Sequence, residues 1–326
     1  MLRLEAMAEN DHAVVGMGKY RNSYLVFETI LVFLITGLLA ELLFGWIDAP
    51  SLRWLLYGPL LLFQGLWCYR IYIVGHETAH KKLFPGNLLL NDVLGSLVLL
   101  PILVPINIYR KIHYYHHGFN RKDVHTSALE TFVVRGRFVR TKTVFYYLVW
   151  YIGIFCGGFF IHSLVSVFLF LFVPPRLAER ISPAFKGWKW QDQVKAILLF
   201  GLGVLGHAGV YHFFGKQAYW LFLGYPLLSF AWVLSLLVYI FHYDTTIGSE
   251  VRYNVRSVRP VPVLSWILMN FNEHATHHQY PNIPWYDLPR KRKSLPAAFA
   301  DKNQTTWSFW RAVFNQLKGP NIVYEH

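Results

Sequence analysis

Long apolar runs separated by short polar links dominate the chain. A bilayer core about 30 Å thick is crossed by roughly 20 apolar helical residues. Four stretches meet that length: Tyr24–Trp46, Trp54–Val74, Val194–Phe213 and Ala218–Phe241. The link IDAPSLR joins the first two and FGKQ joins the last two. Because both links are short, the pattern predicts two tight antiparallel helical hairpins.

Two further apolar stretches do not have the form of a simple span. Leu88–Tyr109 is interrupted by Asn91, Asp92 and two prolines. Val144–Val173 contains paired glycines at 157–158, and it is too long for one span and too short for two. Both stretches are expected to lie in the membrane interface or to re-enter the bilayer.

Positive charge assigns the sides of the membrane. Almost all of the 31 Lys and Arg residues lie in four polar segments, namely 1–23, 76–143, 174–193 and 242–326. The hairpin links carry only Arg53 and Lys216. Since positive residues stay on the cytoplasmic side, the four segments are expected there, which requires that neither ambiguous stretch makes a net crossing. The polar tail after Phe241 is then expected to be a cytoplasmic cap, and residues 1–326 are expected to form one domain with no second domain fused to it.

Composition strengthens this interpretation. Apolar residues make up 54% of the chain, charged residues 15%, and the mean hydropathy is +0.31. The fold class is therefore an all-α integral membrane protein with about four transmembrane helices. The net charge of +13 favours anionic lipid headgroups or an acidic partner protein. The sequence contains no legible nucleic-acid recognition module, so no nucleic-acid partner is expected.

Nine of the 15 histidines form a pattern on the expected cytoplasmic side. They are His76 and His80 in HETAH, His113, His116 and His117 in HYYHH, His274, His277 and His278 in HATHH, and the single His242. Residues three and four apart share one helix face, so each triplet aims its imidazoles toward one side. Neutral imidazole is a ligand for Fe, Zn, Cu or Ni.

The number of histidines separates the possible metal chemistries. HETAH also matches the H-E-x-x-H pattern of zinc proteases, but a catalytic zinc takes only three protein ligands. Nine histidines suit two metal ions, and two irons can activate dioxygen whereas zinc has no accessible redox change. A zinc protease remains an alternative, as does a metal transporter or sensor, which Glu28 and Glu41 within the spans would favour.

Several acids lie beside the histidines in sequence. Metal-bound histidines donate their second N–H to a carboxylate or carbonyl, which fixes the ring. The candidates for that role are Glu77, Asp123, Asp244 and Glu273. On this interpretation Glu77 orients a metal ligand and is not a peptidase base.

The three motifs, in this order, resemble those of the membrane fatty acid desaturase superfamily, which includes hydroxylases and carotenoid oxygenases. The similarity extends from about residue 24 to about residue 290, and includes HATHHQYPNIPWYDLP and PRLAERISP (175–183). The resemblance implies two Fe ions held by the eight motif histidines and His242. It also implies a double bond introduced into a long acyl chain with O₂; the alternative is a hydroxylase or ketolase acting on a lipid, alkane or carotenoid.

The sequence departs from one branch of that family. The first motif is H-x-x-x-H, which disfavours the animal acyl-CoA type, and Val238 occupies the position four residues before His242 where that branch has an asparagine. Asn270 and Asn272 precede the third motif and are candidate substitutes. Without a haem motif at either end, electrons are expected from a separate ferredoxin, rubredoxin or cytochrome b5.

Overall fold

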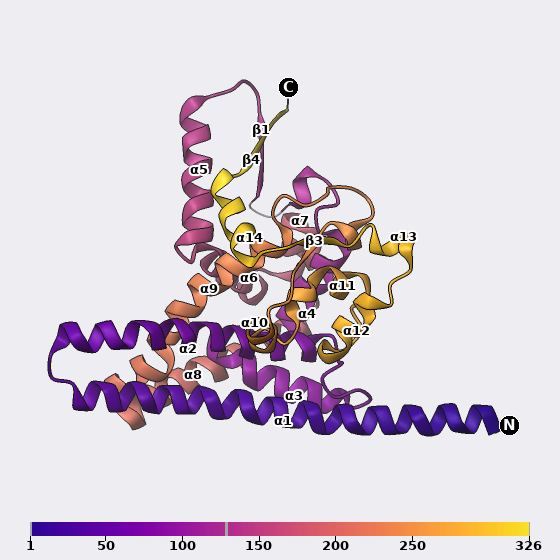
Figure 1. The fold of residues 1–326 in the computed structure, drawn as a ribbon. Helices are drawn as coiled ribbons and strands as arrows, with labels where there is room; N and C mark the ends of the chain where they lie inside the picture. The colour runs from indigo at the N-terminus through magenta and orange to yellow at the C-terminus, as the bar shows by residue number, and fades with distance from the viewer. Residues whose placement is uncertain (1, 128–129, 326) are drawn as a thin grey trace.

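Two long helices form the first hairpin of a helical stem (Figure 1). The computed structural model describes residues 2–127 and 130–325, with side chains from Tyr20 onward. Helix α1 (Leu2–Trp46) is followed after three residues by α2 (Pro50–Ala79), and Pro50 suits the first turn, where no backbone N–H is needed. At the tip, Arg53 Nε donates to Ile47 O at 2.8 Å. The hairpin predicted from the first two apolar runs is present.

The second hairpin comprises α8 (Trp190–Tyr219), the π-helix η4 (Trp220–Gly224) and α9 (Tyr225–His242). Its helical backbone is broken at Gly215, where φ is 87° and ψ is 170°. Only glycine adopts such a conformation without strain. The break lies inside the FGKQ link, where the sequence predicts the turn.

The two ambiguous stretches are each bent at a right angle. Helix α3 (Leu88–Leu99), with η1 (Leu100–Ile102), meets α4 (Ile106–Phe119) at 93°. Helix α5 (Arg140–Phe155) meets α6 (Gly158–Phe172) at 92°, and the joint contains Gly157 with φ 79°. Prolines at 101 and 105 lie at the first joint and paired glycines at the second, so these residues turn the chain, whereas Asn91 and Asp92 lie inside α3.

By length and apolar character, two helices within the described residues can cross a membrane, Tyr20–Trp46 and Trp190–His242, or up to four if each bent pair is one span. Helix α2 is not among these candidates, because Gln64 and Arg70 interrupt its apolar run. Both polar side chains are satisfied inside the stem: Gln64 donates to Leu221 O at 3.2 Å, and Arg70 is paired with Glu28 at 2.6 Å. The span count expected from the sequence is therefore confirmed only as two to four.

Short elements cover one end of the stem and form a cap (Figure 1). The further helices are α7 (Pro175–Ile181), α10 (Pro262–Ile267), α11 (His274–Gln279), α12 (Leu288–Lys293), α13 (Ala297–Ala300) and α14 (Phe309–Asn315). The short helical turns are η2 (Val124–Thr126), η3 (Pro183–Phe185), η5 (Val251–Tyr253), η6 (Phe271–Glu273), η7 (Trp285–Asp287) and η8 (Gln316–Lys318). Strand β1 (Thr131–Arg135) pairs in parallel with β4 (Asn321–Glu325), and β2 (Arg256–Val258) with β3 (Gln304–Thr306).

One hydrophobic core joins stem and cap. It includes Ile73 of α2, Leu237 of α9 and Ala275 of α11, each at most 1% exposed. Burial of apolar side chains stabilises by roughly 25 cal/mol per Å². The ends of α2 and α9 are thereby held against α11, and the histidines lie at these helix ends.

Candidate metal centre

Nine histidines from four separate segments meet where the stem and the cap join. The last turn of α2 carries His76, with His80 directly after the helix, and α9 ends at His242. Helices α4 and α11 carry the two triplets, three and four residues apart. These nine side chains form two groups whose ligand atoms lie within 4.8 Å of one another inside each group.

The larger group contains five imidazoles, those of His76, His80, His113, His117 and His277. Their Nε2 atoms point toward one another. The Nε2 atoms of His76 and His277 are 3.1 Å apart, and those of His80 and His113 are 2.7 Å apart. His117 Nε2 lies 3.0 Å from His113 Nε2 and 3.2 Å from His277 Nε2.

The smaller group contains four imidazoles, those of His116, His242, His274 and His278. The Nε2 atoms of His242 and His274 are 3.1 Å apart. The ring of His116 lies 4.7 Å from that of His242 and 5.0 Å from that of His278. Both ring nitrogens of the buried His278 lack a hydrogen-bond partner within the described chain.

Each triplet is divided between the two groups. In HYYHH, His113 and His117 belong to the larger group and His116 to the smaller. In HATHH, His274 and His278 belong to the smaller group and His277 to the larger. In both triplets the i and i+4 residues stay together and the i+3 residue goes to the other group. The sequence predicted that each triplet faces one side as a unit; the structure shows that each triplet bridges two adjacent groups.

These donors fit a pair of metal ions. Two imidazole nitrogens about 2.1 Å from one ion and at right angles around it lie about 3.0 Å apart, and the Nε2 atoms of His76 and His277 are separated by 3.1 Å. A neutral imidazole has only one N–H, so these rings cannot all hydrogen-bond to one another through their Nε2 atoms. A cation bound between the Nε2 atoms satisfies them all. Burial lowers the pKa of His274, His277 and His278 well below the ordinary histidine value, which keeps these rings neutral.

Glu77 contacts the larger group directly. Its Oε1 lies 3.2 Å from His76 Nδ1 and 3.0 Å from Lys82 Nζ, and its Oε2 accepts from Trp285 N at 3.2 Å. Lys82 Nζ also lies 3.4 Å from His277 Nδ1. Both carboxylate oxygens are engaged in orienting other groups, which suits a residue that fixes a ligand ring. Lys82 was not singled out from the sequence, although its position two residues after His80 was the available signal.

In the part of the chain that the structure describes, the other residues predicted to orient a histidine ring do not contact one as Glu77 does. Glu273, 2% exposed, accepts from Arg292 Nη1 with both oxygens at 3.0 Å and directly precedes His274. Asn270 donates to Trp285 O at 3.2 Å. These two residues therefore fix the chain beside the third motif, and within the described residues their side chains make no hydrogen bond to a histidine ring.

Asp123 and Asp244 also bond elsewhere. Asp123 Oδ1 accepts from the backbone N–H groups of His125 and Thr126 at 3.0 Å each, which is the capping role of an acid at a short helix. Asp244 Oδ2 contacts Asn315 Nδ2 at 3.1 Å and Lys318 Nζ at 3.2 Å. In the described chain their side chains are thus occupied by local caps and surface partners.

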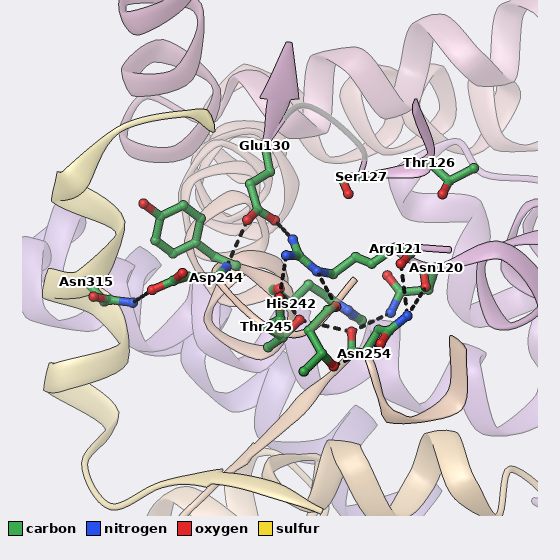
Figure 2. Close-up of polar contacts among 12 residues, drawn as sticks. Asn120, Arg121, Thr126, Ser127, Glu130, His242, Asp244, Thr245, Asn254 and Asn315 are labelled. Carbon is green, nitrogen blue, oxygen red and sulfur yellow. Dashed lines mark hydrogen bonds and ion pairs between the residues drawn. The ribbon is translucent and has the colours of Figure 1, made fainter. Parts of the chain in front are cut away.

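A buried polar cluster joins two of the histidine-bearing segments, and Figure 2 shows Arg121 between Glu130 and the loop after His242. Arg121 is ion-paired with Glu130 and donates to Thr245 O at 2.6 Å. Glu130 Oε1 accepts from Asp244 N at 2.9 Å. The cluster ties the chain four residues beyond His117 to the chain three residues beyond His242. Sequence analysis missed it because the loop that Arg121 and Glu130 bind lies more than a hundred residues further along the chain.

Loss of the carboxylate at position 77 is expected to weaken metal binding. In Glu77→Gln the partner of His76 Nδ1 becomes neutral, and changes of this kind lower metal affinity by about 10- to 100-fold. Competition with a chelator, followed by metal analysis of the protein, measures the change. Asp123→Asn is the matched control, because that carboxylate caps η2; equal metal retention in the two variants would contradict the role of Glu77.

A helical chain with candidate membrane spans and histidine groups able to hold metal has the general features of a membrane-bound metalloprotein. The chain belongs to the fatty acid desaturase family, which it matches over residues 52–310. This confirms the resemblance noted in the sequence, and it makes the protein an oxidoreductase of that family.

Curated relatives agree with this assignment. The chain is 24% identical to the "sn-1 acyl-lipid omega-3 desaturase (ferredoxin)" of Nostoc sp. (strain 36), over 83% of this chain and 76% of the relative. It is 24% identical to the "sn-1 oleoyl-lipid 12-desaturase" of Arthrospira platensis, over 75% of this chain and 69% of the relative. It is 26% identical to the chloroplastic omega-3 fatty acid desaturase of Glycine max, over 85% of this chain and 60% of the relative.

Proposed function

We propose that the protein is an acyl-lipid desaturase that uses two iron ions, O₂ and an external one-electron donor. The observation that carries the proposal is the division of nine histidines into adjacent groups of five and four. In the reaction, an acyl chain loses two hydrogens from neighbouring carbons. O₂ takes up those two hydrogens together with two electrons from the donor and two protons, and leaves as two waters.

The iron ions supply the oxidising power for C–H cleavage when bound, and the chain's residues hold and orient them. The histidines of the larger and smaller groups are the proposed ligands. Glu77 holds the ring of His76 through Nδ1, and Lys82 in turn pairs with Glu77 at 3.0 Å. The Arg121–Glu130 pair keeps the segments bearing His117 and His242 together. Such fixed ligands favour reaction at one position of a substrate.

An apolar cavity in the stem suits part of an acyl chain. It has a volume of ≈ 190 Å³ and lies between α1, α2, α3 and the second hairpin, with Val26, Phe33, Cys68, Val74, Leu97 and Phe222 among its lining residues. Val74 is two residues before His76, so the cavity lies beside the helix end that bears the larger group. Apolar walls bind methylene groups and exclude water.

The same proposal includes the membrane arrangement. The chain is a single multi-pass domain with its histidine groups on the cytoplasmic side. The ends of α2 and α9 that bear histidines lie together, and the basic cap lies at this end, as the positive-inside rule expects. Cysteines introduced singly into the links at Ala49 and Lys216 test it: labelling from the outside of intact cells is expected there and not at Ser294 in the cap.

Expression in a host of known lipid composition tests the activity. The expected result is new acyl chains that are lighter by two hydrogens, detected by mass spectrometry of whole lipids, with the ester still on glycerol. A product heavier by one oxygen would instead identify a hydroxylase. An unchanged lipid profile in cells that supply iron and a reduced ferredoxin would contradict the proposal.

A further inference from the structure

We propose that Trp285–Lys293, together with Arg259, forms the docking surface for an acidic protein that delivers electrons one at a time. The inference rests on the proposed function, since it concerns the donor of the same reaction. We call these residues the basic docking surface. It contains the four consecutive basic residues of α12 and Arg259, which follows β2.

The segment is bonded beside both histidine groups. At its start, Trp285 N donates at 3.2 Å to Glu77, whose other oxygen contacts His76 of the larger group. Near its end, Arg292 Nη1 donates at 3.0 Å to both oxygens of Glu273, which directly precedes His274 of the smaller group. One short surface segment is therefore linked to a histidine of each group through a single intervening residue, Glu77 for the larger group and Glu273 for the smaller.

The outward side of this segment is positively charged. Arg290 is 78% exposed in its side chain, and Lys293 is exposed. Lys291 lies 4.2 Å from the ring centre of Tyr280. The acids bonded to α12 are Asp287, which pairs with Arg290 at 3.2 Å, and the buried Glu273. Positive charge thus exceeds negative charge on the side that faces away from the histidines.

Strand β3 joins the remaining cation to this surface. Arg292 Nη2 donates to Thr305 Oγ1 at 3.3 Å, and Arg259 N donates to Thr306 O at 2.9 Å. Arg259 is exposed. Strand β3 therefore binds both α12 and Arg259 and keeps their cations close together. Figure 1 shows α12 beside α11, the helix of the third histidine motif.

This arrangement fits an acidic electron carrier better than it fits a small substrate. Opposite charges speed encounter and orient the partner. Docking here brings the donor's redox centre against a segment that is bonded to Glu77 beside the larger group and to Glu273 beside the smaller group. The surface is basic and exposed at Arg290 and Lys293, whereas the apolar cavity for a chain lies in the stem.

Direct binding tests the proposal. The iron-loaded enzyme in phosphatidylcholine nanodiscs is titrated with oxidised [2Fe–2S] ferredoxin, and affinity is measured by surface plasmon resonance. The double variant Arg290→Glu/Lys293→Glu is expected to bind at least about tenfold more weakly, and wild-type binding to weaken as salt is added. Arg176→Glu/Arg180→Glu, a reversal at two exposed cations of α7, is the control and is expected to bind like the wild type.

Turnover gives the second readout. With reduced ferredoxin, the α12 variant is expected to show a raised KM for the donor and an unchanged kcat at saturation. When each enzyme is reduced anaerobically with dithionite and methyl viologen, freed of excess reductant and then given O₂, the α12 variant is expected to form as much double bond in one turnover as the wild type. Unchanged affinity, an equal loss in the α7 control, or an equal loss with the chemical reductant would overturn the docking surface.

Two further outcomes identify what has failed. An affinity loss confined to nanodiscs that contain phosphatidylglycerol would assign the cations to lipid headgroups and overturn the proposal. If the wild-type enzyme desaturates with the chemical reductant while the α12 variant binds ferredoxin normally, the desaturase function stands and the docking surface is wrong. If the wild type forms no double bond with any reductant, the function itself has failed, and with it the reason for an electron donor at this surface.

Discussion

Replacement of His277 by alanine is expected to abolish desaturation and to remove one of the two proposed metal ions. Its Nε2 lies 3.1 Å from that of His76 and 3.2 Å from that of His117, so it is a central member of the larger group. Losing a residue that only orients a metal ligand lowers metal affinity by about 10- to 100-fold. Losing the ligand itself is expected to lower metal affinity further. Metal analysis of the purified protein and lipid mass spectrometry of the expressing cells measure the two effects.

His125→Ala is the control for this experiment. His125 lies near the second motif, but its side chain is 62% exposed and pairs with Glu325 at 3.4 Å outside both groups. Its metal content and products are expected to equal those of the wild type. Full metal content in His277→Ala, or equal losses in both variants, would contradict the assignment of His277 as a ligand.

Replacement of Arg121 by methionine is expected to destabilise the protein by about 3–5 kcal/mol, because it leaves Glu130 buried without its cation. Arg121 and Glu130 are 4% and 5% exposed. The variant also loses the bond from Arg121 to Thr245 O, so the smaller group is expected to lose metal at a lower chelator concentration. Thermal unfolding in detergent and chelator competition measure the two effects.

Two variants separate the buried pair from a general effect of charge. Lys302→Met breaks a pair with Glu250 whose side chains are 47% and 59% exposed, and it is expected to cost less than about 1 kcal/mol. Arg121→Met/Glu130→Gln carries no lone buried charge, so it is expected to be more stable than Arg121→Met alone. If the double variant is no more stable, the destabilisation does not arise from the isolated carboxylate.

The carboxylates illustrate the limit of sequence reasoning. Glu77, Asp123, Asp244 and Glu273 were equivalent candidates, since each lies within a few residues of a motif histidine. In the structure Glu77 contacts a histidine ring, Glu273 binds Arg292, Asp123 caps a turn and Asp244 binds surface partners. Sequence distance cannot separate these roles, because a side chain's direction depends on the backbone at its own turn and on which distant segment packs against it.

The sequence by itself determined the helical hairpins, the two stretches that are not simple spans and the nine histidines that meet, because apolar length, glycine and proline conformation and helical spacing are local properties. Only the tertiary structure decided how those histidines divide into five and four, since the partners of each ring come from segments up to about two hundred residues away. The same holds for the Arg121–Glu130 cluster and for the basic segment over both groups. Packing between segments that are distant in sequence decides such contacts, and local sequence patterns do not predict that packing.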